Sequence, residues 1–235
     1  MNILAMDTST LTATVAVLNE EKLLGEFTVC NKLTHSQMIM PMLDTLLKTI
    51  SISVNDIDVF ATSVGPGSFT GLRIGMASIK TLAQALDKPV IGVSSLDAVA
   101  ENFSFTDCII CPIMDARHSE VYNALYHKGE EIVKSRAVNI NTLLEELSDK
   151  NVVFAGDGAL TYGKLIKSFE NEKWMIAPPN FLLPRASSVA AAALKRAAKG
   201  DFDNTYTLNP VYLKKSQAER ELEEKNKKQN TEEKK

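Results

Sequence analysis

The stretch from Ile57 to Gly75, IDVFATSVGPGSFTGLRIG, contains an apolar strand, a glycine-rich turn and the beginning of a helix. Residues 57–64 form a short, largely apolar run, which is typical of a strand that is buried on both faces. Apolar residues at helical spacing follow over 70–86, and the sequence DKP at 87–89 ends this helix. A buried strand that leads through a short turn into a helix predicts an α/β fold.

The glycine-rich turn at 65–71 matches neither of two common phosphate-binding loops. A Walker loop ends in Gly-Lys-Ser or Gly-Lys-Thr, whereas Gly71 is followed by leucine and arginine. The dinucleotide fingerprint has two residues between its second and third glycines, but three residues separate Gly67 from Gly71. The spacing therefore argues against both types of phosphate loop.

Small residues recur on one face of the helix that follows this turn. Gly71, Gly75 and Ser78 are spaced by four and three residues, so they lie along one side of the helix. Such a face lets another backbone approach closely. That backbone can belong to the same subunit or to a partner, because interior and interface packing follow the same physics. The spacing leaves both interpretations open.

Apolar runs on both sides of this stretch predict two related α/β units, each beginning with three antiparallel strands. The elements expected in the first unit cover 2–6, 12–18, 23–29, 34–50, 57–64, 70–86, 90–93 and 95–102. Those expected in the second cover 108–114, 120–126, 131–138, 141–147, 152–155, 159–169 and 187–199. We therefore expect lobes over 1–102 and 103–215, followed by a charged tail over 216–235 that is too polar to fold alone.

Three of the eight methionines lie in the helix predicted over 34–50, at Met38, Met40 and Met42. Methionine suits adaptable surfaces because its side chain is flexible and polarizable. An apolar stripe on a helix, however, more often belongs to the core. From the residues alone, this stripe is interpreted as core.

Two polar turns follow predicted strands and are candidates for ligand binding. Asp7 ends the first strand and is followed by Thr8, Ser9 and Thr10, a set that could hold a hydrated metal and a phosphate. The same residues also suit a simple hydroxyl turn. The turn from Gly156 to Gly158 could bring backbone to a ligand or be a tight turn alone. The sequence leaves each pair of interpretations open.

The composition excludes several classes of protein. The 235 residues are 45% hydrophobic with a formal net charge of -3, which argues against a free-standing nucleic-acid binder. Three cysteines are too few for a disulfide framework. The beginning of the chain lacks a signal-peptide pattern, and no apolar run approaches the about 18–20 residues of a membrane span. We expect a cytoplasmic protein.

The reactive side chains do not form a familiar catalytic pattern. The three histidines, His35, His118 and His127, form no HxxxH or HExxH pair, which argues against a zinc hydrolase. Cys108 and Cys111 have CxxC spacing but fall in a predicted strand, where odd spacing points them to opposite faces. No GxSxG elbow is present. We predict no metal site and no catalytic residue.

Several motifs together resemble one known family. They are ILAMDTST, THSQMIMP, SVGPGSFTGLRIG, PVIGVSSLDA, MDARHSEVY, FAGDGA and NPVYLKKSQAE, in collinear order from Met1 to about Glu219. This pattern is similar to the bacterial tRNA threonylcarbamoyladenosine biosynthesis proteins TsaB, also called YeaZ. The resemblance implies a two-lobed actin-like/Hsp70-like (ASKHA, RNase H-like) α/β fold with mixed sheets flanked by helices.

The resemblance also implies a role as the non-catalytic scaffold subunit of a complex. The complex forms N6-threonylcarbamoyladenosine next to the anticodon of tRNAs that read codons beginning with A. The implied partners are a second copy of the chain, a catalytic TsaD-type paralogue, a TsaE-type ATPase and, through the complex, tRNA. The paralogue binds metal through an HxxxH pair, which this sequence lacks. The implied contact residues lie on two helices: Met38, Met42, Leu46, Gly71, Leu72, Ile74, Gly75 and Ser78.

The resemblance further implies a degenerate nucleotide cleft. Related sugar kinases have Asp-x-Gly in their phosphate loop, whereas this chain has no glycine after Asp7, so close backbone approach to a phosphate is disfavoured. The residues expected to line the cleft are Asp7, Thr8, Ser9, Thr10, Gly156 and Gly158. We expect no tightly bound cofactor, and ATP or ADP only at the interface of the complex.

Two other functions are alternatives to the scaffold role. One is an ATP-dependent transferase or kinase of the ASKHA superfamily, with Asp7 as its metal-linked carboxylate and the 156–158 turn as its nucleotide loop. The sequence offers no second convincing carboxylate or base for that reaction. The other is a protease, for which neither a metal dyad nor a recognisable triad is present.

Overall fold

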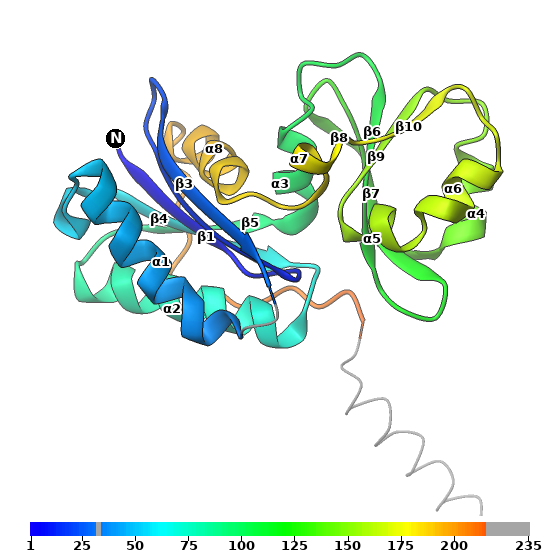
Figure 1. Ribbon diagram of the computed structural model, residues 1–235. Helices are drawn as coiled ribbons and strands as arrows, with labels where there is room; N and C mark the ends of the chain where they lie inside the picture. Colours follow the sequence, from blue (N-terminus) through cyan, green and yellow to red (C-terminus); the bar gives the residue numbers. More distant parts are fainter. Residues whose placement is uncertain (32–33, 215–235) are drawn as a thin grey trace, which may run out of the picture.

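The computed structural model describes residues 1–31 and 34–214, so the tail predicted over 216–235 lies outside the described residues. Two five-stranded mixed sheets form two lobes, seen side by side in Figure 1. The first sheet consists of β1 (Ile3–Asp7), β2 (Thr12–Leu18), β3 (Leu23–Cys30), β4 (Val59–Gly65) and β5 (Val90–Ser94). The second consists of β6 (Ile109–Asp115), β7 (Glu120–His127), β8 (Glu130–Asn139), β9 (Val152–Ala155) and β10 (Trp174–Ile176).

The two sheets have the same topology. Their strand orders are β3-β2-β1-β4-β5 and β10-β9-β6-β7-β8, which are the same arrangement read from opposite edges. In each sheet the first strand pairs antiparallel with the second and parallel with the fourth. The prediction of two related α/β units, each beginning with a three-stranded meander, is confirmed.

Helices cover both faces of the first sheet. The helices are α1 (His35–Ile50), α2 (Phe69–Ala85), α3 (Ser95–Glu101), α4 (Ile140–Glu146), α5 (Asp157–Thr161), α6 (Gly163–Ser168), α7 (Pro179–Leu182) and α8 (Ala186–Ala197), with a 3-10 turn at Val54–Asp56. Buried residues of α1 and α2, such as Leu46 and Ile79, pack with Leu4 and Met6 of β1 in one core. On the opposite face α8 packs against Ile3.

The chain crosses back to the first lobe near its end. Sequence placed 187–199 in the second lobe, but α8 packs on the first sheet, where Ala186, Val189, Ala190, Ala193 and Ala197 are buried. Small side chains on this helix allow it to approach β1 and β2 closely. In contrast, α3 adds Leu96 and Val99 to the core of the second lobe. The lobes are therefore interleaved in sequence.

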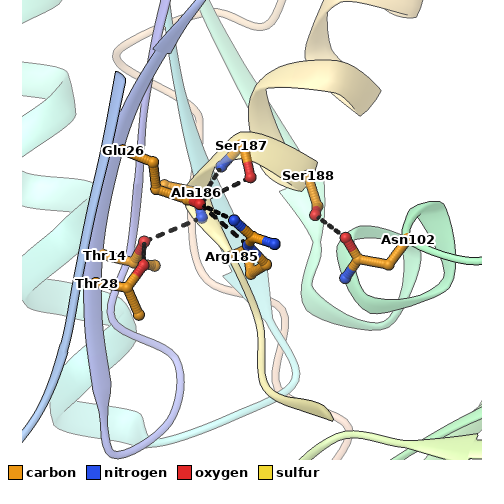
Figure 2. A network of polar contacts seen from close by, with 8 residues as sticks. All are labelled: Thr14, Glu26, Thr28, Asn102, Arg185, Ala186, Ser187 and Ser188. Atoms are coloured by element: carbon orange, nitrogen blue, oxygen red, sulfur yellow. Dashed lines mark hydrogen bonds and ion pairs between the residues drawn. The ribbon is translucent and has the colours of Figure 1, made fainter. Parts of the chain in front are cut away.

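Polar contacts hold the beginning of α8 in place (Figure 2). The Glu26 carboxylate on β3 accepts hydrogen bonds from the Ser187 backbone N–H at 2.9 Å and from its hydroxyl at 2.7 Å. It also pairs with the Arg185 guanidinium. The Thr14 hydroxyl accepts from the Ala186 N–H at 3.2 Å. Glu26 and Thr14 thus each satisfy one free amide at the positive end of α8 and fix the return crossing.

Some elements differ from the sequence-based expectation. The helix expected over 159–169 is split into α5 and α6 at Tyr162. Strand β10 was not expected, because three residues are too few for a periodic signal. Helix α1 continues through Pro41. No helix among the described residues is long and apolar enough to cross a membrane.

Candidate functional site

The polar turn after β1 is buried inside the first lobe. Asp7 is completely buried, and its carboxylate accepts hydrogen bonds from the Ser9 N–H at 2.7 Å and the Ser9 hydroxyl at 2.8 Å. The Ser63 hydroxyl, on β4, donates to the other carboxylate oxygen. Burial raises the pKa of Asp7 above its ordinary value, against the opposing effect of these hydrogen bonds.

The glycine-rich turn packs directly on this polar turn. A Cβ on Gly67 would lie 2.5 Å from Ser9 O, and a Cβ on Gly71 would lie 2.0 Å from Thr8 O. A Cβ on Gly75 would lie 2.5 Å from the Thr8 hydroxyl oxygen. These contacts are far closer than side chains tolerate, so glycine is required for the close approach of the two turns. Gly71 and Gly75 therefore serve packing within the subunit.

A phosphate does not fit this turn as the subunit holds it. Thr8, Ser9 and Thr10 are 1–5% exposed, and the Thr8 hydroxyl donates to Gly71 O at 2.7 Å. The Ser9 carbonyl accepts from the Ser68 N–H at 2.7 Å. The Asp7 carboxylate that would hold a metal ion, and the Thr8 and Ser9 hydroxyls that would contact a phosphate, thus already form hydrogen bonds within the subunit, and the glycine-rich turn packs on them. The geometry is that of a hydroxyl turn.

The corresponding turns of the second lobe hold a pair of carboxyl groups. The Asp115 N–H, at the end of β6, donates to Asp157 Oδ1 at 3.2 Å, and the Tyr162 hydroxyl lies 3.3 Å from Asp115 Oδ1. Burial raises the pKa of Asp157 to about 6, and the Asp115 carboxylate acts in the same direction. Gly156 and Gly158 allow this turn to lie on β6, because a Cβ on either would come within 2.8 Å of Ile113 O. These glycines therefore serve internal packing.

The two groups of predicted cleft residues lie against different parts of the structure. Thr8 and Ser9 contact the glycine-rich turn of the first lobe, and Gly156 and Gly158 pack on β6 of the second. Between β6 and β7, Arg117, His118 and Ser119 have positive φ, and the Arg117 N–H donates to Asp115 Oδ1 at 2.8 Å. Each lobe thus has its own compact turn at the end of its central strand.

The predicted contact residues divide into a buried and an accessible group. Five are covered by the subunit's own atoms: Met42, Leu46, Gly71, Leu72 and Gly75. Met38, Ile74 and Ser78 are half-buried and lie toward the surface of α1 and α2. Only this second group offers side-chain surface to another molecule in this conformation.

A segment near the C-terminal end of the described chain contacts α2, a position that no sequence pattern predicted. The Tyr212 ring stacks on Phe69 with centroids 4.3 Å apart, and the Tyr212 hydroxyl accepts from Arg73 Nε at 3.0 Å. The Arg73 guanidinium lies 4.1 Å from the Phe69 ring centroid. The motif NPVYLKKSQAE contains this tyrosine, so the signal was present, but no local periodicity shows what it contacts.

Comparison with protein families places this geometry in a known group. The family model "TsaD: tRNA N6-adenosine threonylcarbamoyltransferase" matches residues 30–222. The TsaB protein of Bacillus subtilis, a tRNA threonylcarbamoyladenosine biosynthesis protein, is 35% identical over 225 residues, covering 93% of this chain and 96% of that protein. The Escherichia coli TsaB protein is 31% identical over 94% of this chain and 98% of its own length.

Solved structures agree with the fold. YeaZ from Pseudomonas aeruginosa superposes with a TM-score of 0.75 at 27% identity, covering 90% of this chain and 99% of that one. The activator of 2-hydroxyisocaproyl-CoA dehydratase from Clostridium difficile has a TM-score of 0.56 at 11% identity, covering 85% and 97% of the two chains, which shows a shared fold alone. The fold is thus the two-lobed actin-like one that the motifs implied. With near full-length similarity to several TsaB proteins, the chain belongs to the TsaB (YeaZ) family of tRNA threonylcarbamoyladenosine biosynthesis proteins.

Proposed function

We propose that this protein is the non-catalytic scaffold subunit of the cytoplasmic complex that forms N6-threonylcarbamoyladenosine in tRNA. In this proposal it forms a homodimer, and it exchanges into a complex with a catalytic TsaD-type paralogue and a TsaE-type ATPase. The tRNA is bound by the complex. The observation that carries the proposal is the 35% identity to a TsaB protein over nearly the whole of both chains.

The arrangement of the polar turns favours a scaffold role over independent catalysis. The carboxylate best placed for phosphate chemistry, Asp7, is completely buried and accepts hydrogen bonds from Ser9 and Ser63. Its pKa is raised by burial, which disfavours the charged form that a metal ion needs. We therefore assign no step of the reaction to this chain, and we place any ATP or ADP at the interface of the complex.

The accessible faces of α1 and α2 are the surface that we assign to the partner. Met38, Ile74 and Ser78 are half-buried at this surface. Substituting Ser78 by arginine places a long charged side chain there, and burying an unpaired charge at an interface is strongly unfavourable. Because Ser78 is itself accessible, this substitution tests the interface without disturbing the buried contacts of Gly71 and Gly75.

The experiment is size-exclusion chromatography with light scattering, on the protein alone and mixed with the catalytic paralogue. A matched control is Ser168→Arg on α6, since both serine hydroxyls donate to a carbonyl of their own helix, Ser78 to Ile74 O and Ser168 to Leu165 O. We expect Ser78→Arg to weaken the homodimer and the complex at least tenfold, and Ser168→Arg to weaken neither.

Three results would contradict the proposal. If the wild-type protein is a monomer and does not bind the paralogue, the scaffold role is wrong. A folded Ser78→Arg variant that still forms both assemblies would move the interface away from α2. ATP turnover by the isolated protein that is lost in Asp7→Ala would favour the independent transferase or kinase instead.

A further inference from the structure

The last described segment of the chain runs from the first lobe to the second (Figure 1, orange). After α8, the Asp203 N–H donates to Val90 O at 2.9 Å, so the chain first follows the edge of the first sheet at β5. It then passes the end of β4 and the first turns of α2. We call residues 208–214 the C-terminal strap.

The strap is attached firmly to the first lobe. The Lys80 ammonium on α2 donates to Leu208 O at 2.9 Å, and the Val211 N–H donates to Val64 O at 2.7 Å. Gly65 allows this approach, since a Cβ on it would lie 2.6 Å from Val211 O. Together with the stacked pair of Tyr212 and Phe69, these contacts fix the strap over β4 and α2.

Among the residues that the structure describes, the strap reaches the second lobe through the Lys214 side chain. Lys214 donates to the Glu120 carboxylate at the beginning of β7, and its Nζ lies 6.0 Å from the centroid of the Tyr122 ring. The Lys214 side chain is 17% exposed and that of Glu120 is 39% exposed. A partly exposed ion pair of this kind contributes little to stability, so it is easily broken.

We propose that the C-terminal strap is an internal clamp that holds the two lobes in one relative orientation, with the pair Lys214–Glu120 as its releasable contact. The lobes are also joined by the backbone near residues 102–108 and 177–185 and by α3, which packs against both of them, so the strap adds a further bridge. In consequence, the orientation of the second lobe relative to α2 depends on charge at positions 120 and 214. This inference does not depend on the proposed function.

The test is a charge swap read out by the distance between the lobes. Nitroxide labels are placed on Cys30, which is exposed on β3, and on a cysteine introduced by Lys164→Cys on α6. Cys108→Ser removes the other accessible thiol. Pulsed electron paramagnetic resonance then gives the distance distribution for this background, for Lys214→Glu, for Glu120→Lys and for the double variant.

We expect one narrow distance distribution in the background and a distribution at least twofold broader in each single variant. The double variant restores the opposite charges and should return the narrow distribution. Lys150→Glu is the matched control, because Lys150 pairs with its neighbour Asp149 within the second lobe, and it should change nothing. Circular dichroism checks that every variant is folded. Single variants that keep the narrow distribution, or a double variant that stays broad, would overturn the proposal.

Discussion

At the scale of single residues, the distinctive glycines of this chain act by letting backbones meet. Gly71 and Gly75 bring α2 onto the turn after β1, and Gly156 brings the turn after β9 onto β6. This dense packing excludes water from the acidic groups that it encloses. Burial raises the pKa of Asp7 and of Asp157, so both carboxyl groups resist ionisation.

The Asp157 carboxyl group should make the stability of the protein depend on pH. Its pKa rises from 3.8 to about 6 on folding, so the folded state binds more protons between these values and stability falls as pH rises through them. Asp157→Asn removes this titration and keeps an oxygen that can accept from the Asp115 N–H. We expect the fall between pH 4 and pH 6.5 to be smaller by about 1–2 kcal/mol in the variant.

Urea unfolding at a series of pH values measures this difference. Asp149→Asn is a suitable control, because Asp149 is an exposed carboxyl group whose pKa is lowered by hydrogen bonding to Lys150. Its loss should leave the pH dependence of the free energy of unfolding unchanged above pH 4. Equal slopes for wild type and Asp157→Asn would show that Asp157 ionises normally in the folded protein.

At the scale of elements, α8 depends on a partner from a distant strand. The Ser187 N–H in its first turn has no intrahelical acceptor, and its N-cap residue, Arg185, makes no capping hydrogen bond with its side chain. The Glu26 carboxylate supplies the missing acceptor across 161 residues of sequence, as Figure 2 shows. A helix that closes one face of the first sheet is thus fixed by a β3 side chain.

Glu26→Gln should therefore destabilise the protein. The glutamine amide oxygen can replace one carboxylate oxygen, but its NH2 group then faces either Arg185 or Ser187, both donors in the native network. We expect a loss of about 2 kcal/mol in the free energy of unfolding, measured by urea titration. Glu21→Gln, in the exposed turn between β2 and β3, should change it by less than about 0.5 kcal/mol. Equal stability of the two variants would contradict the capping role.

At the scale of the whole molecule, the lobes are distinct sheets but not independent segments of sequence. The first sheet has α1 and α2 on one face, and its other face is covered by α8, which follows the entire second lobe in sequence. Ile3, Ala5 and Ile91 are completely buried beneath that helix. The first lobe is therefore complete only when residues from both ends of the chain are present.

A fragment of residues 1–102 should consequently fail to fold alone. Without α8, the apolar face of its sheet is exposed to water, and burial of such surface is the main stabilising contribution in a domain. We expect no cooperative thermal transition for the fragment, measured by circular dichroism. Co-expression with residues 183–214 should restore one, whereas co-expression with residues 103–182 should not. A fragment 1–102 that melts cooperatively by itself would contradict this expectation.

The sequence alone determined the fold class, the family and most of the elements. Strand β4, the turn at 65–71 and helix α2 carry strong local signals, because apolar periodicity and turn chemistry depend on neighbouring residues. The repeated strand–strand–strand–helix order of both halves could also be predicted from the sequence. Short elements such as β10 were not, since three residues do not form a pattern.

Only the tertiary structure decided what each special residue contacts. The spacing of Gly71, Gly75 and Ser78 suited an interface or an interior, and the atoms of Thr8 show that the two glycines face the interior. The importance of Glu26 and Tyr212 was not visible either, because their partners lie 161 and 139 residues away. Periodicity reports which face of an element is apolar, whereas the identity of the neighbour depends on how distant segments meet in space.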